Sequence, residues 1–233
     1  MNRALITVVV LCLCVVSVVV EETPTRAVAA NGEQLDSSEP LGLDVETYAP
    51  GNDAVRFKFS THIAFGPGEQ EIVTDLRNHR LLYRDSPADP FKISPIVMRG
   101  PHSVVYNPAD KLYYANDTDN HRIIAFADLG SETIAAETKR IAGITLKRPH
   151  DIVIDPKTGW IYAINPYSGH VFRFSAIGEN ESAVKAPVAG YARALTFANG
   201  KLYAIGSAKG RIVEIADWDA PTFKTYDSLD TTG

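Results

Sequence analysis

Residues 117–126, with the sequence DTDNHRIIAF, decide the fold of this chain. A short polar turn leads directly into a strongly apolar segment, which predicts a β-strand that is entered through a tight turn. Related segments occur at three other places, as DLRNHRLLY, NPYSGHVFRF and GSAKGRIVEI at residues 75–83, 165–174 and 206–215. The chain is therefore built from a repeat that contains this turn and strand.

The repeat also contains two earlier apolar segments. Four residues open the repeats at equivalent positions, and they are His62, His102, His150 and Arg193. Their successive spacings are 40, 48 and 43 residues. Periods of about 40–50 residues with several short strands are typical of β-propeller blades. Segments 104–106 and 152–154 are apolar throughout, as expected for strands covered on both faces, and outer strands are expected at 137–141 and 222–226. We predict an all-β propeller of about four four-stranded blades with few helices.

Three segments resemble a known family. Residues 117–126 and the shorter NHRL at 78–81 are similar to the NHL repeat, and PHDIVIDP at 149–156 resembles its opening strand. The resemblance covers about residues 60–216 and implies an NHL-like propeller, in a superfamily that includes peptidyl-glycine α-amidating lyase-like propellers. Because such propellers usually have six blades, the chain is either part of a longer, six-bladed propeller, which we favour, or an unusual closed ring of four blades. The family includes scaffolds, sensors, ligand binders and enzymes, so the fold alone implies no one function.

The N-terminus predicts export. Residues 4–20 are mostly apolar, follow Arg3 and end at Glu21. The run is longer than a typical secretory core and close to the length of a membrane span, so both interpretations stay open. We favour a cleaved signal, because residues 27–29 (AVA) match the small-residue cleavage pattern. We expect residues 1–29 to be a signal peptide, giving a secreted or extracytoplasmic protein, or a membrane anchor through residues 4–20.

The remaining chain divides into a polar linker, residues 30–44, and a propeller, residues 45–233. Cys12 and Cys14 are the 2 cysteines, so the propeller has no thiolate for zinc or nucleophilic catalysis. The formal net charge of −5 argues against nucleic acid as a partner. The composition is 45% hydrophobic and 22% charged, which is ordinary for a globular domain.

The first candidate site is the column formed by the residues that open the repeats. Because innermost strands surround a central channel, His62, His102 and His150 point to an axial metal site, and Arg193 lines the same channel. The resemblance to amidating lyase-like propellers implies zinc, although only His102 and His150 have the Pro-His form and Arg193 would repel a cation. The alternative, which we favour, is that these histidines hydrogen-bond neighbouring blades.

The second candidate column closes the middle strand of the repeat at Asp75, Asp117 and Asn165, with Gly206 in the fourth. Its oxygens could bind calcium, as gluconolactonase-like propellers bind a divalent ion through acid and amide oxygens. This chain departs from that pattern, because it has His102-Ser103 and His150-Asp151 where those propellers have an Asn-Gly strand opening. We favour capping of the following turn, since Asx turns are common and Gly206 interrupts the set.

A third column follows the turn, at Arg80, Arg122, His170 and Arg211. We expect these side chains to pair with the acidic column in surface contacts of about 0–1 kcal/mol each. Two glycosylation sequons begin at Asn116 and Asn180.

The leading function is a binding module for a small molecule, glycan, peptide or protein, with membrane contact only through an uncleaved N-terminus. One alternative is a metal-dependent lyase or hydrolase centred on His62, His102 and His150. A second alternative is an interaction scaffold with no small-molecule site, which an exposed apolar patch would favour.

Overall fold

The computed structural model describes residues 6–8, 16–18, 55–207 and 210–227. The chain divides into two units, Met1–Ala49 and Pro50–Gly233. In the first unit, β1 (Ile6–Val8) and β2 (Val16–Val18) form a two-stranded antiparallel sheet. The rest of the expected signal or anchor and the polar linker lie outside the described residues. None of the helices in the part that is described has the length and apolar character needed to cross a membrane.

The described residues of the second unit form four four-stranded antiparallel sheets, in which strands adjacent in sequence are neighbours. Blade one contains β3 (Ser60–Phe65), β4 (Glu71–Asp75), β5 (Arg80–Arg84) and β6 (Lys92–Ile93). Blade two contains β7 (Pro101–Asn107), β8 (Leu112–Asp117), β9 (Arg122–Phe126) and β10 (Ala136–Thr138). Blade three contains β13 (Asp151–Ile154), β14 (Ile161–Ile164), β15 (His170–Phe174) and β16 (Ser182–Lys185). Blade four contains β17 (Ala192–Ala198), β18 (Lys201–Gly206), β19 (Ile212–Asp217) and β20 (Thr222–Tyr226). The predicted all-β propeller with about four blades is confirmed.

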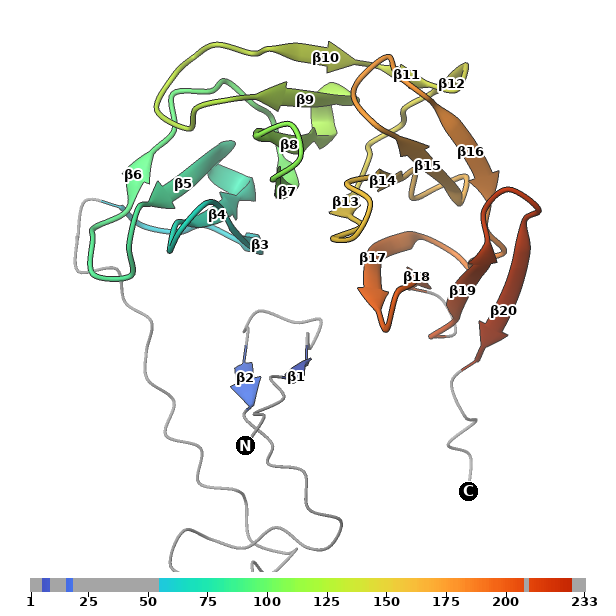
Figure 1. Cartoon of the computed structure of the whole chain (residues 1–233). Coiled ribbons are helices and arrows are strands. Elements are labelled where there is room, and N and C mark those ends of the chain that lie inside the picture. Colours follow the sequence, from blue (N-terminus) through green and yellow to red (C-terminus); the bar gives the residue numbers. More distant parts are fainter. Residues whose placement is uncertain (1–5, 9–15, 19–54, 208–209, 228–233) are drawn as a thin grey trace, which may run out of the picture. The chain divides into compact units, whose positions relative to one another are not determined.

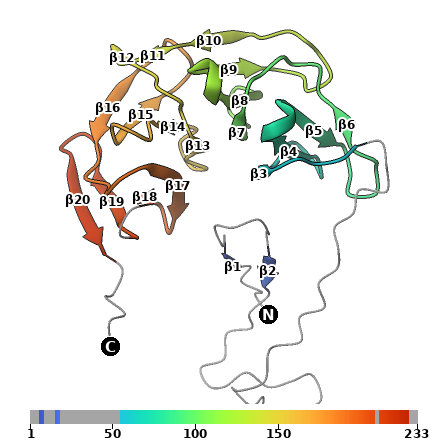
Figure 2. The same ribbon diagram turned by 180° about the vertical axis from the view of Figure 1, so that it is seen from behind.

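The blades follow one another along an arc, with their first strands on its inner side and their last strands on its outer side (Figures 1 and 2). The inner strands contact each other in order: β3 packs beside β7, β7 beside β13 and β13 beside β17. Residues at the beginnings of these strands therefore come together from different blades.

Three inner strands carry a β-bulge near their start. The pairing register shifts between Ser60 and His62 in β3, between Pro101 and Val104 in β7, and between Ala192 and Ala194 in β17. A bulge redirects side chains away from the regular alternation of the strand and is frequent beside functional sites. The irregularity lies at the residues that open these repeats.

The core is a series of apolar layers between neighbouring blades. Ile72 and Leu81 of blade one pack with Val104 and Ala115 of blade two in one such layer. Tyr114 of blade two packs against blade three in the next. Because both faces of a middle blade are covered, its strands are apolar at successive positions. This burial, which stabilises by about 25 cal/mol per Å² of apolar surface, fixes each blade against the next.

The outer part of blade two differs from the sequence prediction. A single strand was expected over residues 137–141, whereas β10 ends at Thr138. A separate hairpin follows, formed by β11 (Arg140–Ile141) and β12 (Ile144–Thr145). Its turn residues Ala142 and Gly143 have φ values of 50° and 76°, as a two-residue hairpin turn of type I′ requires. The described helices are the short 3₁₀ turns η1 (Leu76–Asn78) and η2 (Thr118–Asn120), in agreement with the expectation of few helices.

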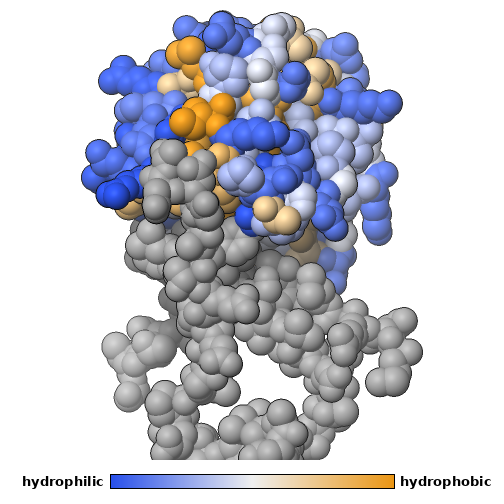
Figure 3. All heavy atoms as spheres, turned by 90° about the vertical axis from the view of Figure 1, so that its left-hand side faces the viewer, coloured by the Kyte–Doolittle hydropathy of each residue, from blue (hydrophilic) through white to orange (hydrophobic). Residues whose placement is uncertain are grey.

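The surface of blade one is mainly hydrophilic on the side seen in Figure 3, with hydrophobic residues interspersed. Large apolar side chains exposed in and beside this blade are Phe59, Phe65, Ile93 and Val97. In a separate apolar cluster, Val55 and Phe91 pack with Val73 and Leu82. Segment 55–58 therefore protects apolar surface of blade one.

Candidate functional site

The residues at the ends of the middle strands accept hydrogen bonds from the backbone segment that precedes each blade. Asp75 Oδ1 accepts the backbone N–H of Lys58 at 2.6 Å, and Asp117 Oδ1 accepts that of Arg99 at 2.7 Å. In blade three, Asn165 Oδ1 accepts the N–H of Lys147 at 3.0 Å. All three side chains are buried. Their oxygens therefore face backbone donors, as expected for turn-capping residues.

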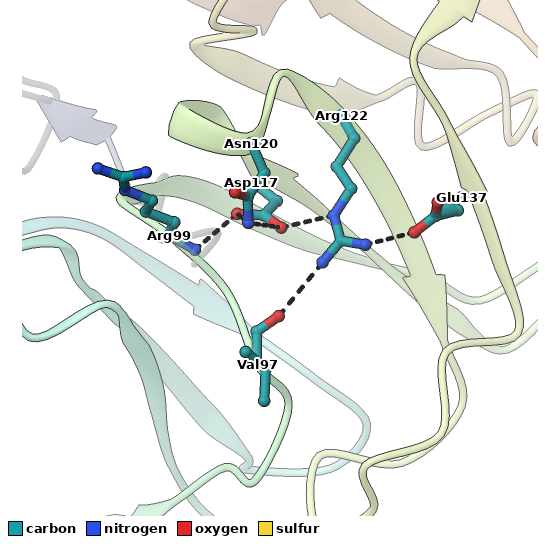
Figure 4. A network of polar contacts seen from close by, with 6 residues as sticks. All are labelled: Val97, Arg99, Asp117, Asn120, Arg122 and Glu137. Carbon is teal, nitrogen blue, oxygen red and sulfur yellow. Dashed lines mark hydrogen bonds and ion pairs between the residues drawn. The ribbon is translucent and has the colours of Figure 1, made fainter.

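Two of these residues also bind arginine. Arg80 Nε lies 2.9 Å from Asp75 Oδ2, and Arg122 Nε lies 2.6 Å from Asp117 Oδ2. In Figure 4, Asn120 also approaches Asp117, while Arg122 reaches Glu137 on its other side. Both aspartate side chains are 0% exposed, so the expectation of surface contacts was wrong. A buried carboxylate needs such partners, because it has lost its contact with water.

Blades three and four replace this charged pair in different ways. In blade three, the residues equivalent to the aspartate and the arginine are Asn165 and His170. Asn165 Nδ2 donates to Thr145 O at 3.0 Å, and His170 Nδ1 lies 2.9 Å from Ser168 Oγ. In blade four, a Cβ on Gly206 would lie 2.4 Å from Ala189 O, so no side chain fits there. Arg211 pairs instead with Asp227 at 2.6 Å.

The histidines of the NHR turns connect one blade to the next. His79 and His121 each have a φ of 57° and follow the 3₁₀ turns. Their Nδ1 atoms accept the backbone N–H groups of Gly100 and Arg148, each at 3.0 Å. The sequence repeat marked these histidines, but only the structure assigns this role.

The inner face of blades two to four contains a chain of aromatic contacts. The rings of His102 and His150 lie 4.0 Å apart between centroids and are tilted by 31°. His150 meets Tyr191 edge to face at 5.3 Å, and Tyr191 meets Tyr167 in the same way at 5.0 Å. The guanidinium carbon of Arg193 lies 5.6 Å from the centroid of the Tyr191 ring. We call His102, His150, Tyr167 and Tyr191 the imidazole–tyrosine cluster.

Both histidines of this cluster are neutral near pH 7. Burial, reinforced by Arg148 and Arg193, lowers the pKa of His102 from 6.5 to about 4. Burial lowers the pKa of His150 to about 3, helped by the neighbouring His102, although a hydrogen bond to the backbone of Arg193 acts in the opposite direction. The positive charge at this face therefore comes from the two arginines.

His62 does not take part in the ring contacts of His102 and His150. Burial lowers its pKa to about 4, and its Nδ1 atom is buried without a hydrogen-bond partner. Blade one instead reaches His102 through Thr61, whose hydroxyl donates to His102 O at 2.9 Å. Within the described residues, His62 has no ring contact with His102 or His150.

The predicted metal trio does not match this geometry. Among residues 55–207 and 210–227, no group of three or more His, Cys, Asp or Glu side chains could hold a metal ion. His102 and His150 face each other ring to ring, whereas the lone pairs that bind metals lie in the ring planes. The described residues thus do not fit a three-histidine zinc site or an oxygen-rich calcium site.

Asp151 joins three blades at the same face and was not identified from the sequence. Its carboxylate accepts the N–H of Leu195 in blade four at 2.8 Å and that of Ile152 at 2.9 Å. Ser103 of blade two also hydrogen-bonds to it, while burial raises its pKa to about 6. The only sequence signal was a carboxylate beside His150, immediately before an apolar strand.

An open depression of about 440 Å³ adjoins the cluster. It shares Tyr167 with the cluster, and its other lining residues are His121, Lys139, Thr145, Leu146, Lys147 and Arg148. Arg148 pairs with Asp119 at 2.9 Å and also lowers the pKa of both cluster histidines. Sequence reasoning missed the depression, because its residues come from the hairpin between blades and from two turns.

Comparison with solved structures identifies the fold as a β-propeller. A putative gluconolactonase matches with a TM-score of 0.62 at 16% identity, over 81% of this chain and 68% of that one. Virginiamycin B lyase from Staphylococcus aureus matches with a TM-score of 0.59 at 15% identity, over 74% and 56%. A chain of the nidogen–laminin complex matches with a TM-score of 0.57 at 14% identity, over 73% and 64%. These neighbours are consistent with an NHL-like propeller.

The comparisons extend no further than the fold, since the identities are low. The chain spans 56% of the lyase chain and 64% of the nidogen–laminin chain. No protein-family model matches the sequence. No curated protein has a significantly similar sequence.

Proposed function

We propose that this chain is an exported NHL-like propeller module that binds a small anionic ligand at the imidazole–tyrosine cluster. The observation that carries the proposal is the position of Arg148 and Arg193 beside two uncharged imidazoles. Burial and aromatic contacts keep the histidines neutral, so the guanidinium groups supply the charge. A ligand carboxylate or phosphate would bind these groups through charge-assisted hydrogen bonds.

Arg193 is the more available of the two arginines. Its side chain is exposed and lies over Tyr191, and it has no ion pair with any carboxylate of the described residues. Arg148 is already paired with Asp119. A guanidinium held against an aromatic ring keeps its outer N–H groups free for a planar anion.

The two alternatives have weaker support. A metal-dependent lyase or hydrolase would need a ligand set that the described residues do not form. A scaffold without a ligand site would be favoured by a continuous apolar surface, but the apolar residues of blade one lie among hydrophilic ones (Figure 3).

Binding of benzoate, followed by saturation-transfer NMR, tests the proposal. Benzoate offers a planar carboxylate to Arg193 and a ring to Tyr191. Arg77→Gln is a matched control, because Arg77 is also exposed and lies 5.1 Å from the centroid of Phe59. We expect binding by the unmodified chain and by Arg77→Gln, and at least a tenfold weaker affinity for Arg193→Gln. Equal binding by all three proteins, or by none, contradicts the proposal.

Export is tested separately by sequencing the N-terminus of the protein recovered outside the cytoplasm. The AVA segment at residues 27–29 leads us to expect a mature chain that begins at Ala30. An exported chain that still begins at residue 1 supports the anchor, and retention in the cytoplasm contradicts both interpretations.

A further inference from the structure

The open depression beside the cluster has a mainly apolar lining, to which the side chains of two lysines and one arginine contribute. Lys139 and Lys147 are exposed, and neither has a carboxylate partner within the described ranges. Arg148 supplies a third cation and is balanced by Asp119 at 2.9 Å. Two of the residues that form the depression are therefore uncompensated cations, which favours a ligand with both an apolar face and an anionic group.

The backbone that carries these cations is already held in place. Leu146 N–H donates to Lys139 O at 2.8 Å, which closes the β11–β12 hairpin between the two lysines. Lys147 N–H donates to Asn165 Oδ1 at 3.0 Å, and Arg148 N–H donates to His121 Nδ1 at 3.0 Å. Binding would therefore order side chains but not this backbone, which lowers its entropic cost.

Arg148 also has an unusual backbone conformation. Its φ is 52°, in the left-handed region that a residue with a side chain rarely adopts. Such strain is maintained only where surrounding contacts enforce it, and it gathers at functional sites. Here the contact with His121 and the ion pair with Asp119 hold Arg148 at the edge of the depression.

Tyr167 supplies an aromatic wall next to the cations. Its side chain is 66% exposed, and its ring meets Tyr191 edge to face with the centroids 5.0 Å apart. An exposed aromatic face can pack against the C–H face of a pyranose ring, while ammonium groups bind a carboxylate on the same sugar. Because the depression is open, it can hold one unit of a longer chain.

We infer that this depression binds an acidic saccharide, with uronate carboxylates at Lys139 and Lys147 and a sugar ring against Tyr167. The inference rests on the proposed binding of anions at this face and specifies the class of ligand. It predicts that an acidic oligosaccharide binds more tightly than benzoate, because it contacts both the depression and the adjoining arginines.

Calorimetric titration of the full chain with trigalacturonate tests the inference, and uncharged maltotriose serves as the matched saccharide. We expect trigalacturonate to bind at least tenfold more tightly than benzoate, and maltotriose not to bind. The double variant Lys139→Gln/Lys147→Gln and the single variant Tyr167→Ala should each weaken trigalacturonate binding at least tenfold. Tyr167→Phe, which keeps the ring, should retain it.

Lys157→Gln/Lys185→Gln is the control, since it removes two exposed lysines of blade three that do not line the depression. It should bind trigalacturonate like the unmodified chain. If benzoate binds through Arg193 but trigalacturonate is no tighter, or is unaffected by the Lys139, Lys147 and Tyr167 changes, the saccharide inference fails alone. If neither anion binds, the proposed function fails as well.

Discussion

The imidazoles of His102 and His150 stack across the boundary between blades two and three, with their centroids 4.0 Å apart. Each histidine opens the inner strand of its blade, so the repeat brings the two residues to the beginnings of neighbouring strands. Two stacked imidazoles at this distance cannot both be charged without strong repulsion. The contact therefore requires both imidazole rings to be neutral. As a result, the centre of the imidazole–tyrosine cluster is polar but uncharged.

The stack should make the propeller sensitive to acid. The pKa values of His102 and His150 fall from 6.5 to about 4 and about 3 on folding. Below pH 6.5 these two histidines are protonated in the unfolded chain but stay neutral in the folded chain. The stability that is present above pH 6.5 is therefore lost as the pH falls towards 3–4. We expect the thermal midpoint to fall over this interval, and to fall less steeply in His150→Asn. Parallel pH profiles for the two proteins, measured by circular dichroism, would contradict this prediction.

Transferring the charged pair of blade two to the equivalent positions of blade three tests the role of these strand-end residues. Asp117 is paired with Arg122 in blade two, whereas the equivalent residues of blade three, Asn165 and His170, are joined only by a backbone hydrogen bond. Asn165→Asp introduces a buried carboxylate that has no guanidinium beside it. We therefore expect the free energy of unfolding to fall by about 2–4 kcal/mol. Adding His170→Arg should restore at least half of that loss, as measured by urea denaturation. A double variant no more stable than Asn165→Asp would show that the pairs are not equivalent.

Gly206 should be intolerant of any side chain. A Cβ there would lie 2.4 Å from the backbone oxygen of Ala189, which cannot move aside as a side chain can. We expect Gly206→Ala to lower the free energy of unfolding by about 1–3 kcal/mol. Gly66→Ala is the control, since its Cβ would meet the flexible side chain of Gln70. Equal effects of the two changes in a denaturant titration would refute the steric explanation.

The structure distinguishes the two glycosylation sequons. Asn116 is fully buried and donates to Ser103 Oγ at 2.8 Å, whereas Asn180 is exposed in the turn before β16. Secretion from a glycosylating host should therefore modify Asn180 alone. Peptide mass spectrometry after enzymatic removal of the glycan identifies the modified residue. A glycan found on Asn116 would be incompatible with the buried position described above.

The architecture was predictable because it is encoded locally. Each NHR-like turn and each apolar strand can be recognised within about ten residues, and repetition reinforces the signal. The β11–β12 hairpin was missed because residues 137–141 look like one strand. Only the positive φ values of Ala142 and Gly143 reveal a turn between two shorter strands.

The site was less predictable because it depends on contacts between blades. The repeat placed His102 and His150 in one column, but it did not indicate that their rings stack. Tyr191 and Lys139 lie outside the aligned segments, so no repeat position marked them. The buried contacts of Asp151 with blades two and four depend on how three inner strands pack, which one sequence does not specify.

A crystal of the full chain soaked with 4-bromobenzoate tests the central claim most directly, because anomalous scattering locates the bromine. Our account predicts a bromine position beside Tyr191, with the carboxylate within hydrogen-bonding distance of the Arg193 guanidinium. A bromine located only at sites remote from Arg193, Tyr191 and His150 would contradict the proposal that this face binds anions.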